Sequence, residues 1–132
     1  MFVLNGNQKK ILNMMKKCGL NEYESKAYFT LLISGKSKAW DLYKRSSVPN
    51  SKIYSIIEEL KRKGLVEIEG WKPKMISPIS FSKYLRSTIK SKQKEIESLE
   101  KFGKEVNEIV YYLKPIATKF KRYRVFEPKY RR

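Results

Sequence analysis

The sequence has 132 residues, of which 41% are hydrophobic, and this is enough for one compact domain with an appendage. It carries 30 Lys and Arg against 13 Asp and Glu, and a net charge of +17 favours polyanionic partners, chiefly nucleic acid and secondarily an acidic membrane face. Histidine is absent and Cys18 is the single cysteine, which argues against an enzyme, a metal site and an intrachain disulfide. No apolar run is long enough to span a membrane and the N-terminus lacks signal-peptide features, so we expect a cytoplasmic protein without a cofactor.

Apolar spacing and capping residues predict three helices in the first third of the chain. A stripe of apolar residues covers 8–18 and ends at Gly19. Asn21 then caps a second helix that ends near Gly35, and Ser37 caps a short third helix that runs to about Ser46. The apolar positions of the second helix are Tyr23, Ala27, Tyr28, Leu31 and Leu32.

A turn, a fourth helix and a hairpin follow. Pro49 keeps the preceding residue out of helical conformation and so separates the third helix from the next one. Asn50 or Ser51 then caps a helix that ends at Gly64. Residues 65–69 alternate as in a strand, 74–77 are a plausible returning strand, and Gly-Trp-Lys-Pro between them is turn chemistry. The order helix, helix, turn, helix, hairpin predicts a mostly α winged helix-turn-helix domain over residues 1–81.

Residues 82–113 form the longest predicted helix, opened by Ser82 and stopped by Pro115. Steps of four and three residues give a heptad pattern in which Lys92 and Gly103 are the flaws. We expect this helix to pair two copies into a homodimer; the alternative is a helix that folds back on the winged domain. The dimerisation residues are Leu85, Ile89, Ile96, Leu99, Phe102, Val106, Val110 and Leu113.

Residues 114–132 form a basic aromatic tail with 8 basic side chains against 1 acidic. Lys121, Arg122 and Arg124 are candidates for phosphate contacts, which add salt-dependent affinity. A tail that is disordered before binding is the other interpretation.

The helix from Asn50 to Lys63 corresponds to a recognition helix, whose first turns enter the major groove. The absence of Arg and Gln from the outer side of its first turn and a half indicates modest sequence specificity. The N-terminus of the preceding helix could hold a phosphate. The hairpin tip at 70–74 would reach a minor groove or the backbone, although we expect Trp71 to pack on the wing rather than contact DNA. The candidate DNA-binding residues are Ser37, Lys38, Asn50, Ser51, Lys52, Tyr54, Ser55, Trp71, Lys72 and Lys74.

Three segments also carry a family resemblance: Cys-Gly-Leu-Asn-Glu-Tyr-Glu-Ser-Lys-Ala-Tyr at 18–28, Ser-Ser-Val-Pro-Asn-Ser-Lys-Ile-Tyr at 46–54 and Leu-Lys-Arg-Lys-Gly-Leu-Val-Glu at 60–67. They closely resemble the winged-helix domain of the TrmB family of archaeal transcription regulators. The resemblance implies a dimeric regulator whose recognition helix begins at Ser51-Lys52, with Tyr54 nearby. Larger family members carry a C-terminal sugar-binding domain for which 132 residues leave no room, so we expect no small-molecule effector.

These observations favour a transcription regulator that binds double-stranded DNA as a homodimer. The alternatives are an architectural, chromatin-like DNA-binding protein and an RNA-binding or protein-assembly module. An enzyme fits worst, because the sequence lacks histidine, a Gly-rich phosphate loop and clustered carboxylates.

Overall fold

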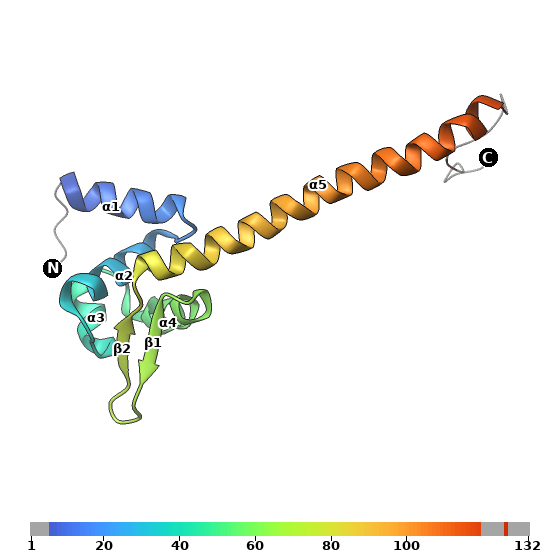
Figure 1. Ribbon diagram of the computed structural model, residues 1–132. Coiled ribbons are helices and arrows are strands. Elements are labelled where there is room, and N and C mark those ends of the chain that lie inside the picture. The colour runs from blue at the N-terminus through green and yellow to red at the C-terminus, as the bar shows by residue number, and fades with distance from the viewer. Residues whose placement is uncertain (1–5, 120–125, 127–132) are drawn as a thin grey trace, which may run out of the picture. The chain divides into compact units, whose positions relative to one another are not determined.

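The computed structural model describes residues 6–119 and Phe126, and it contains five helices and a two-stranded sheet in those residues (Figure 1). The chain divides into two compact units, Met1–Thr88 and Ile89–Arg132. The order of elements in the first unit is that of a winged helix-turn-helix domain. No helix among the described residues is both long enough and apolar enough to cross a membrane.

Helix α2 (Glu22–Ser34) lies at the centre of the first unit and packs against α1 (Gly6–Lys17), α3, α4 and β2 (Figure 1). Because α2 has neighbours on several sides, its buried positions do not form a single stripe. Thr30 is buried, whereas Leu32 is 40% exposed, so the predicted place of Leu32 on the inner face is wrong. The Asn21 cap is confirmed, since its Oδ1 accepts from the Glu24 N–H at 2.8 Å.

Helix α3 (Ala39–Ser46) begins after Lys38, and Lys38 makes no side-chain cap. The prediction that Ser37 caps this helix is wrong because Ser37 pairs with the hairpin instead. Its N–H donates to the Ile76 carbonyl at 3.0 Å, and its hydroxyl donates to the Gly35 carbonyl at 2.9 Å. Ser37 is buried in this arrangement and forms an isolated antiparallel β-bridge with Ile76 of β2.

Helix α4 (Asn50–Lys63) begins one residue after Pro49, which takes the cap position. The Pro49 carbonyl accepts from the Lys52 and Ile53 amides at 2.9 and 3.1 Å, so neither Asn50 nor Ser51 caps the helix as predicted. Gly64 ends the helix with φ +83°, as expected for a left-handed C-cap. The predicted inner face is confirmed, and the buried residues are Ile53, Ile56, Ile57 and Leu60.

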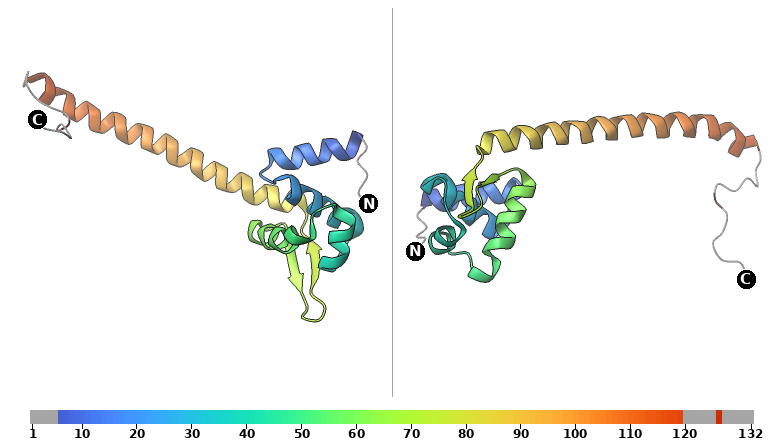
Figure 2. Two further views of the ribbon diagram at one scale, coloured as in Figure 1. Left: turned by 180° about the vertical axis from the view of Figure 1, so that it is seen from behind. Right: turned by 90° about the horizontal axis from the view of Figure 1, so that it is seen from below.

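Strands β1 (Val66–Glu69) and β2 (Met75–Pro78) form the antiparallel wing, in the register Val66↔Pro78 to Glu69↔Met75. In Figure 2 the hairpin tip extends beyond the helices of its own unit. Gly70 has φ +79°, and a Cβ at this position would lie 2.9 Å from the Pro73 carbonyl oxygen. The tight tip therefore requires glycine at this position.

Helix α5 (Phe81–Lys119) packs its first turns against the core of the first unit. The Phe81 ring packs on Tyr28 at a centroid distance of 5.9 Å, and the Tyr84 hydroxyl donates to the Cys18 carbonyl at 2.9 Å. The Ser80 hydroxyl accepts from the Lys83 N–H at 3.3 Å, so Ser80 rather than Ser82 opens the helix.

The predicted stop before Pro115 is also wrong, because α5 continues through Pro115 to Lys119. Proline lacks the N–H that would bond to the carbonyl four residues earlier, and this costs about 3 kcal/mol in a helix interior. Only the final turn follows Pro115, and the residues after it keep helical conformation. The proline is therefore tolerated inside the helix instead of ending it.

Candidate nucleic-acid interface

The first two turns of α4 present a polar face opposite the core. Ile53 and Ile57 point inward, while the residues on the other side are exposed. Tyr54 is 68% exposed although it is a large aromatic residue, and the Ser55 hydroxyl donates to the Lys52 carbonyl at 2.9 Å. The predicted residues brought together on this face are Asn50, Ser51, Lys52, Tyr54 and Ser55.

The basic side chains of α4 differ in whether they form an ion pair with an acidic side chain. Arg62 is hydrogen-bonded to the Glu59 carboxylate at 2.9 Å; this lowers the pKa of Glu59 and raises the pKa of Arg62. Lys63 bonds to Glu24 at 2.8 Å and to the Gly19 carbonyl at 2.9 Å. Lys52 makes no ion pair within the described part of the chain. The cation at the N-terminal end of α4 therefore remains available to an external anion.

A hollow that the sequence reasoning missed lies beside the start of α4, over α3 and the turn. It has a volume of about 580 Å³ and is lined by Trp40, Tyr43, Lys44, Ser47, Val48 and Pro49. The Trp40 and Tyr43 rings are 5.3 Å apart, and the Lys44 ammonium lies 4.8 Å from the Trp40 ring. The signal in the sequence was the i, i+4 spacing of Trp40 and Lys44, which puts both on one helix face. Of the two residues predicted at this helix start, Lys38 is exposed and Ser37 is buried.

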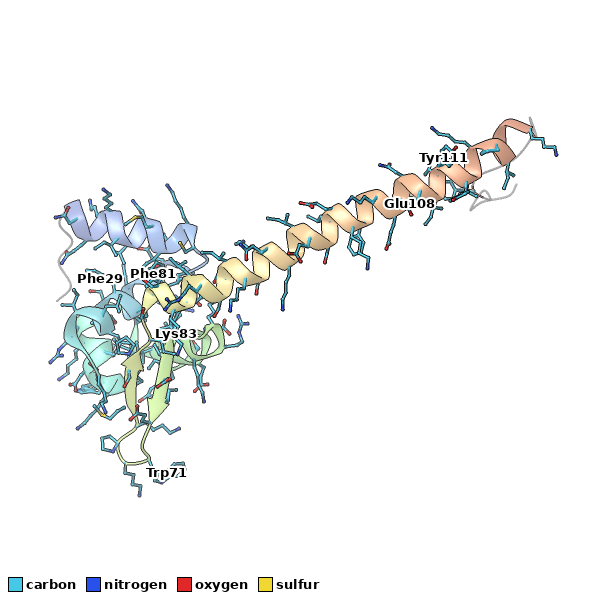
Figure 3. All side chains as sticks on the ribbon, in the orientation of Figure 1. Phe29, Trp71, Phe81, Lys83, Glu108 and Tyr111 are labelled. Carbon is cyan, nitrogen blue, oxygen red and sulfur yellow. The ribbon has the colours of Figure 1, made fainter. Side chains whose placement is uncertain are left out.

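The hairpin tip carries Trp71 with Lys72 and Lys74, all of them exposed (Figure 3). Trp71 is 78% exposed, and the Lys74 ammonium lies 5.8 Å from its ring. The expectation that Trp71 packs on the wing is therefore wrong, because the four-residue strands end before the tip and provide no surface there. An exposed indole with two lysines on the same tip can stack on a base or sugar while the ammonium groups contact phosphates.

The apolar stripe of α5 is exposed within the chain from Ile89 onward. Leu85 is half-buried, whereas the other seven predicted dimerisation residues are 43–67% exposed. Lys121, Arg122 and Arg124 of the tail lie outside the described residues. Within the part of the chain that the structure describes, no three Cys, Asp or Glu side chains are grouped as metal ligands would be.

The arrangement described above defines a winged helix-turn-helix protein: a core of helices, a second helix with a polar exposed face, and a two-stranded wing beside it. Residues 15–82 match the family model of the sugar-specific transcriptional regulator TrmB. The chain belongs to the TrmB family of transcriptional regulators, which confirms the resemblance in the sequence.

Two curated relatives each match about three quarters of this chain. The HTH-type sugar sensing transcriptional regulator TrmBL1 of Pyrococcus furiosus is 37% identical over 99 residues, which cover 75% of this chain and 29% of that protein. The Bacillus subtilis protein YrhO is 27% identical over 95 residues, which cover 72% of this chain and 34% of YrhO. The chain thus matches only about a third of the length of these curated relatives.

Among solved structures, the archaeal chromatin protein TrmBL2 has a similar fold. Its TM-score is 0.72 at 23% sequence identity, and the match covers 91% of this chain and 48% of that chain. The predicted fold class, a winged helix-turn-helix followed by a long C-terminal helix, is confirmed.

Proposed function

We propose that the chain binds double-stranded DNA as a homodimeric regulator, with α4 in the major groove. The observation that carries this proposal is the exposed polar face of α4, whose only cation in the first two turns, Lys52, has no acidic partner among the residues that the structure describes. Membership of a transcriptional-regulator family supports the same function.

On α4, short side chains and one lysine suit mixed contacts with base edges and phosphates. Ser51 can donate to or accept from base edges, and Ser55 can accept from them while its own proton goes to the Lys52 carbonyl. Lys52 binds phosphate, and the exposed Tyr54 ring contacts a thymine methyl group or a sugar. Glu58 lies a turn further on, where a carboxylate is further from the phosphates.

The hollow beside α4 extends the proposed interface to the sugar–phosphate backbone of the DNA. Lys38 and Lys44 are exposed at the two ends of α3, and the Trp40 ring offers an apolar surface beside Lys44. A sugar–phosphate segment fits this chemistry, since the ammonium binds the phosphate while the indole packs on the deoxyribose. In a helix-turn-helix the first helix crosses the backbone in just this way.

The wing supplies the third contact. Trp71, Lys72 and Lys74 reach the minor groove or the adjoining phosphates, and the tight turn at Gly70 holds the tip in place.

The stripe of α5 completes the proposal by pairing two copies. A helix with half-exposed Ile96, Leu99 and Val106 gains most by covering them with an identical stripe. Two recognition helices about one turn of DNA apart, roughly 34 Å, then read a pseudo-palindromic site. The sugar sensing in the name of TrmBL1 does not enter the proposal, because the match covers 29% of that protein.

Binding to two duplexes of equal length, one from upstream of the chain's own gene and one random, tests the function across a salt series. A site-specific regulator prefers the upstream duplex by about a hundredfold or more, and the preference persists as salt rises. The double variant Lys52→Ala and Tyr54→Ala should bind about tenfold or more weakly, whereas Lys61→Ala, at the other end of α4, should bind as the parent does. Equal losses in both variants would contradict the placement of α4.

A change of Ile96 and Leu99 to Asp tests the dimer separately. Light scattering should then give the mass of one chain with the winged domain still folded. An unchanged mass would place the interface elsewhere.

A second candidate function is that of an architectural, chromatin-like DNA-binding protein. It is favoured by the lack of Arg and Gln on the exposed first turns of α4, which leaves few bidentate base contacts, and by the fold shared with TrmBL2, described as an archaeal chromatin protein. Equal and steeply salt-dependent binding to both duplexes would support this function. Preference for single-stranded or structured RNA would instead support the RNA-binding alternative.

A further inference from the structure

The apolar face of α5 becomes wider along the helix. With Leu85 at heptad position d, residues 85–98 carry apolar side chains at positions a and d only, and their g positions are Thr88 and Glu95. From residue 99 to residue 117 the g positions are apolar as well. We call this set the g column: Phe102, Ile109 and Ile116, which are 56%, 59% and 41% exposed.

This difference in width matters because a pair of helices covers only a narrow stripe. A two-stranded coiled coil buries positions a and d, or two of every seven residues, whereas a helix inside a larger bundle needs about three of seven. The g column provides that third position from Phe102 to Ile116, over about 21 Å of helix at the α-helical rise per residue. One partner helix therefore leaves the g column at the rim, partly in water.

Two structural features support a further helix on this face. Because α5 continues through Pro115, Ile116 stays in phase with Ile109, and Pro115 itself falls at position f on the outer side. A hollow of about 450 Å³, lined by Lys94, Glu95, Ser98, Leu99 and Phe102, lies where the g column begins. A side chain of a neighbouring helix would fill it.

The charge of this segment indicates which partner it fits. The whole chain has a net charge of +17, but residues 99–117 contain three lysines and three glutamates. Copies of this strongly basic chain therefore repel one another only weakly at this segment. Every copy also presents the same g column, so a second dimer is a self-complementary partner that closes the assembly.

We propose that residues 99–117 join two dimers through the g column into a four-helix segment that carries four winged domains. The inference rests on the dimer proposed above. One assembly then holds two DNA duplexes at once, so the chain bridges DNA in addition to binding it.

Analytical ultracentrifugation of the full chain tests the assembly. The parent should sediment with the mass of four chains, and the double variant Ile109→Gln and Ile116→Gln, at two g positions outside the predicted dimerisation residues, with the mass of two. Glutamine is a good helix former, so α5 should keep its helical circular dichroism. The matched control Tyr111→Gln and Tyr112→Gln removes exposed aromatic area at positions b and c, outside the stripe, and should leave four chains. If the glutamine variant loses helicity, the corresponding alanine variant replaces it.

The outcomes separate this inference from the dimer. A parent of two chains, or a double variant that keeps four or falls to one, would overturn the four-helix segment. A parent of one chain would overturn the dimer as well. In a bridging assay, beads with one immobilised duplex should capture a second, fluorescent duplex through the parent. The double variant should bind each duplex but capture none, and equal capture by the parent and the double variant would also overturn the inference.

Discussion

Replacing Lys63 by Met would remove the cation that joins the end of α4 to the start of α2. Its ammonium bonds to the Glu24 carboxylate at 2.8 Å and to the Gly19 carbonyl at 2.9 Å, and Glu24 is only 1% exposed. Breaking a buried ion pair from one side costs about 3–5 kcal/mol, because the other charge is left without compensation. Glu24 keeps its hydrogen bond from the Asn21 N–H, and the Lys63 side chain is 23% exposed, which admits water. We therefore expect a cost at the lower end of this range, a loss of about 3 kcal/mol in the free energy of unfolding.

Urea unfolding at pH 7, followed by circular dichroism, measures this loss. With a slope of about 1 kcal/mol per molar urea for a small domain, the midpoint should fall by roughly 3 M. Lys61→Met, an exposed change on the same helix, should cost less than about 0.5 kcal/mol. Adding Glu24→Gln to Lys63→Met should recover part of the loss, since no buried charge then remains. A loss in Lys63→Met below about 1 kcal/mol, or no recovery in the double variant, would refute the reasoning.

Three further changes test other parts of the winged domain. Burial raises the pKa of Tyr28 to about 12, so the folded protein should lose stability as the pH rises from about 10 to 12. The variant Tyr28→Phe should lack this part of the decline. If the free energy of unfolding falls in parallel with pH in both proteins, the prediction is contradicted. The change Gly70→Ala should lower the free energy of unfolding by about 1–2 kcal/mol, because the new Cβ would meet the Pro73 carbonyl oxygen and the backbone φ at this position is +79°. Thermal unfolding measures this loss, and an unchanged melting temperature would show that the tip can relax. In a Trp40→Phe background, duplex DNA should quench Trp71 fluorescence, and an unaltered spectrum on binding would remove the wing from the interface.

Much of the fold followed from local patterns. The spacing of Ile53, Ile57 and Leu60 identified the inner face of α4, and Gly64 marked its end, because both signals lie within a few residues of the feature they determine. The exposed polar residues of α4 followed from the same periodicity.

The errors arose where distant residues decide the outcome. Nothing local tells Ser37 to pair with Ile76, 39 residues later, rather than to cap a helix. The Lys63–Glu24 pair spans the same separation and was not predicted. Thr30 is buried on α2 because its hydroxyl bonds to the Lys26 carbonyl of its own helix, which lets a polar residue enter the core.

Two statistical rules also failed for physical reasons. Proline disfavours a helix interior by only a few kcal/mol, which the rest of α5 outweighs at Pro115. Large aromatic residues are usually buried, yet Trp71 lies at a tip that has no surface to cover it.

The pairing of Ser37 with Ile76 makes the two edges of the wing unequal. Strand β2 has a neighbour on each side at Ile76, while β1 pairs only with β2 among the described residues. The free edge of β1 carries Glu67 and Glu69, both exposed. Charged side chains on an open edge discourage it from pairing with a strand of another molecule. The wing is thus protected against aggregation through its own sheet, which matters for a chain whose copies would gather at high local density on DNA.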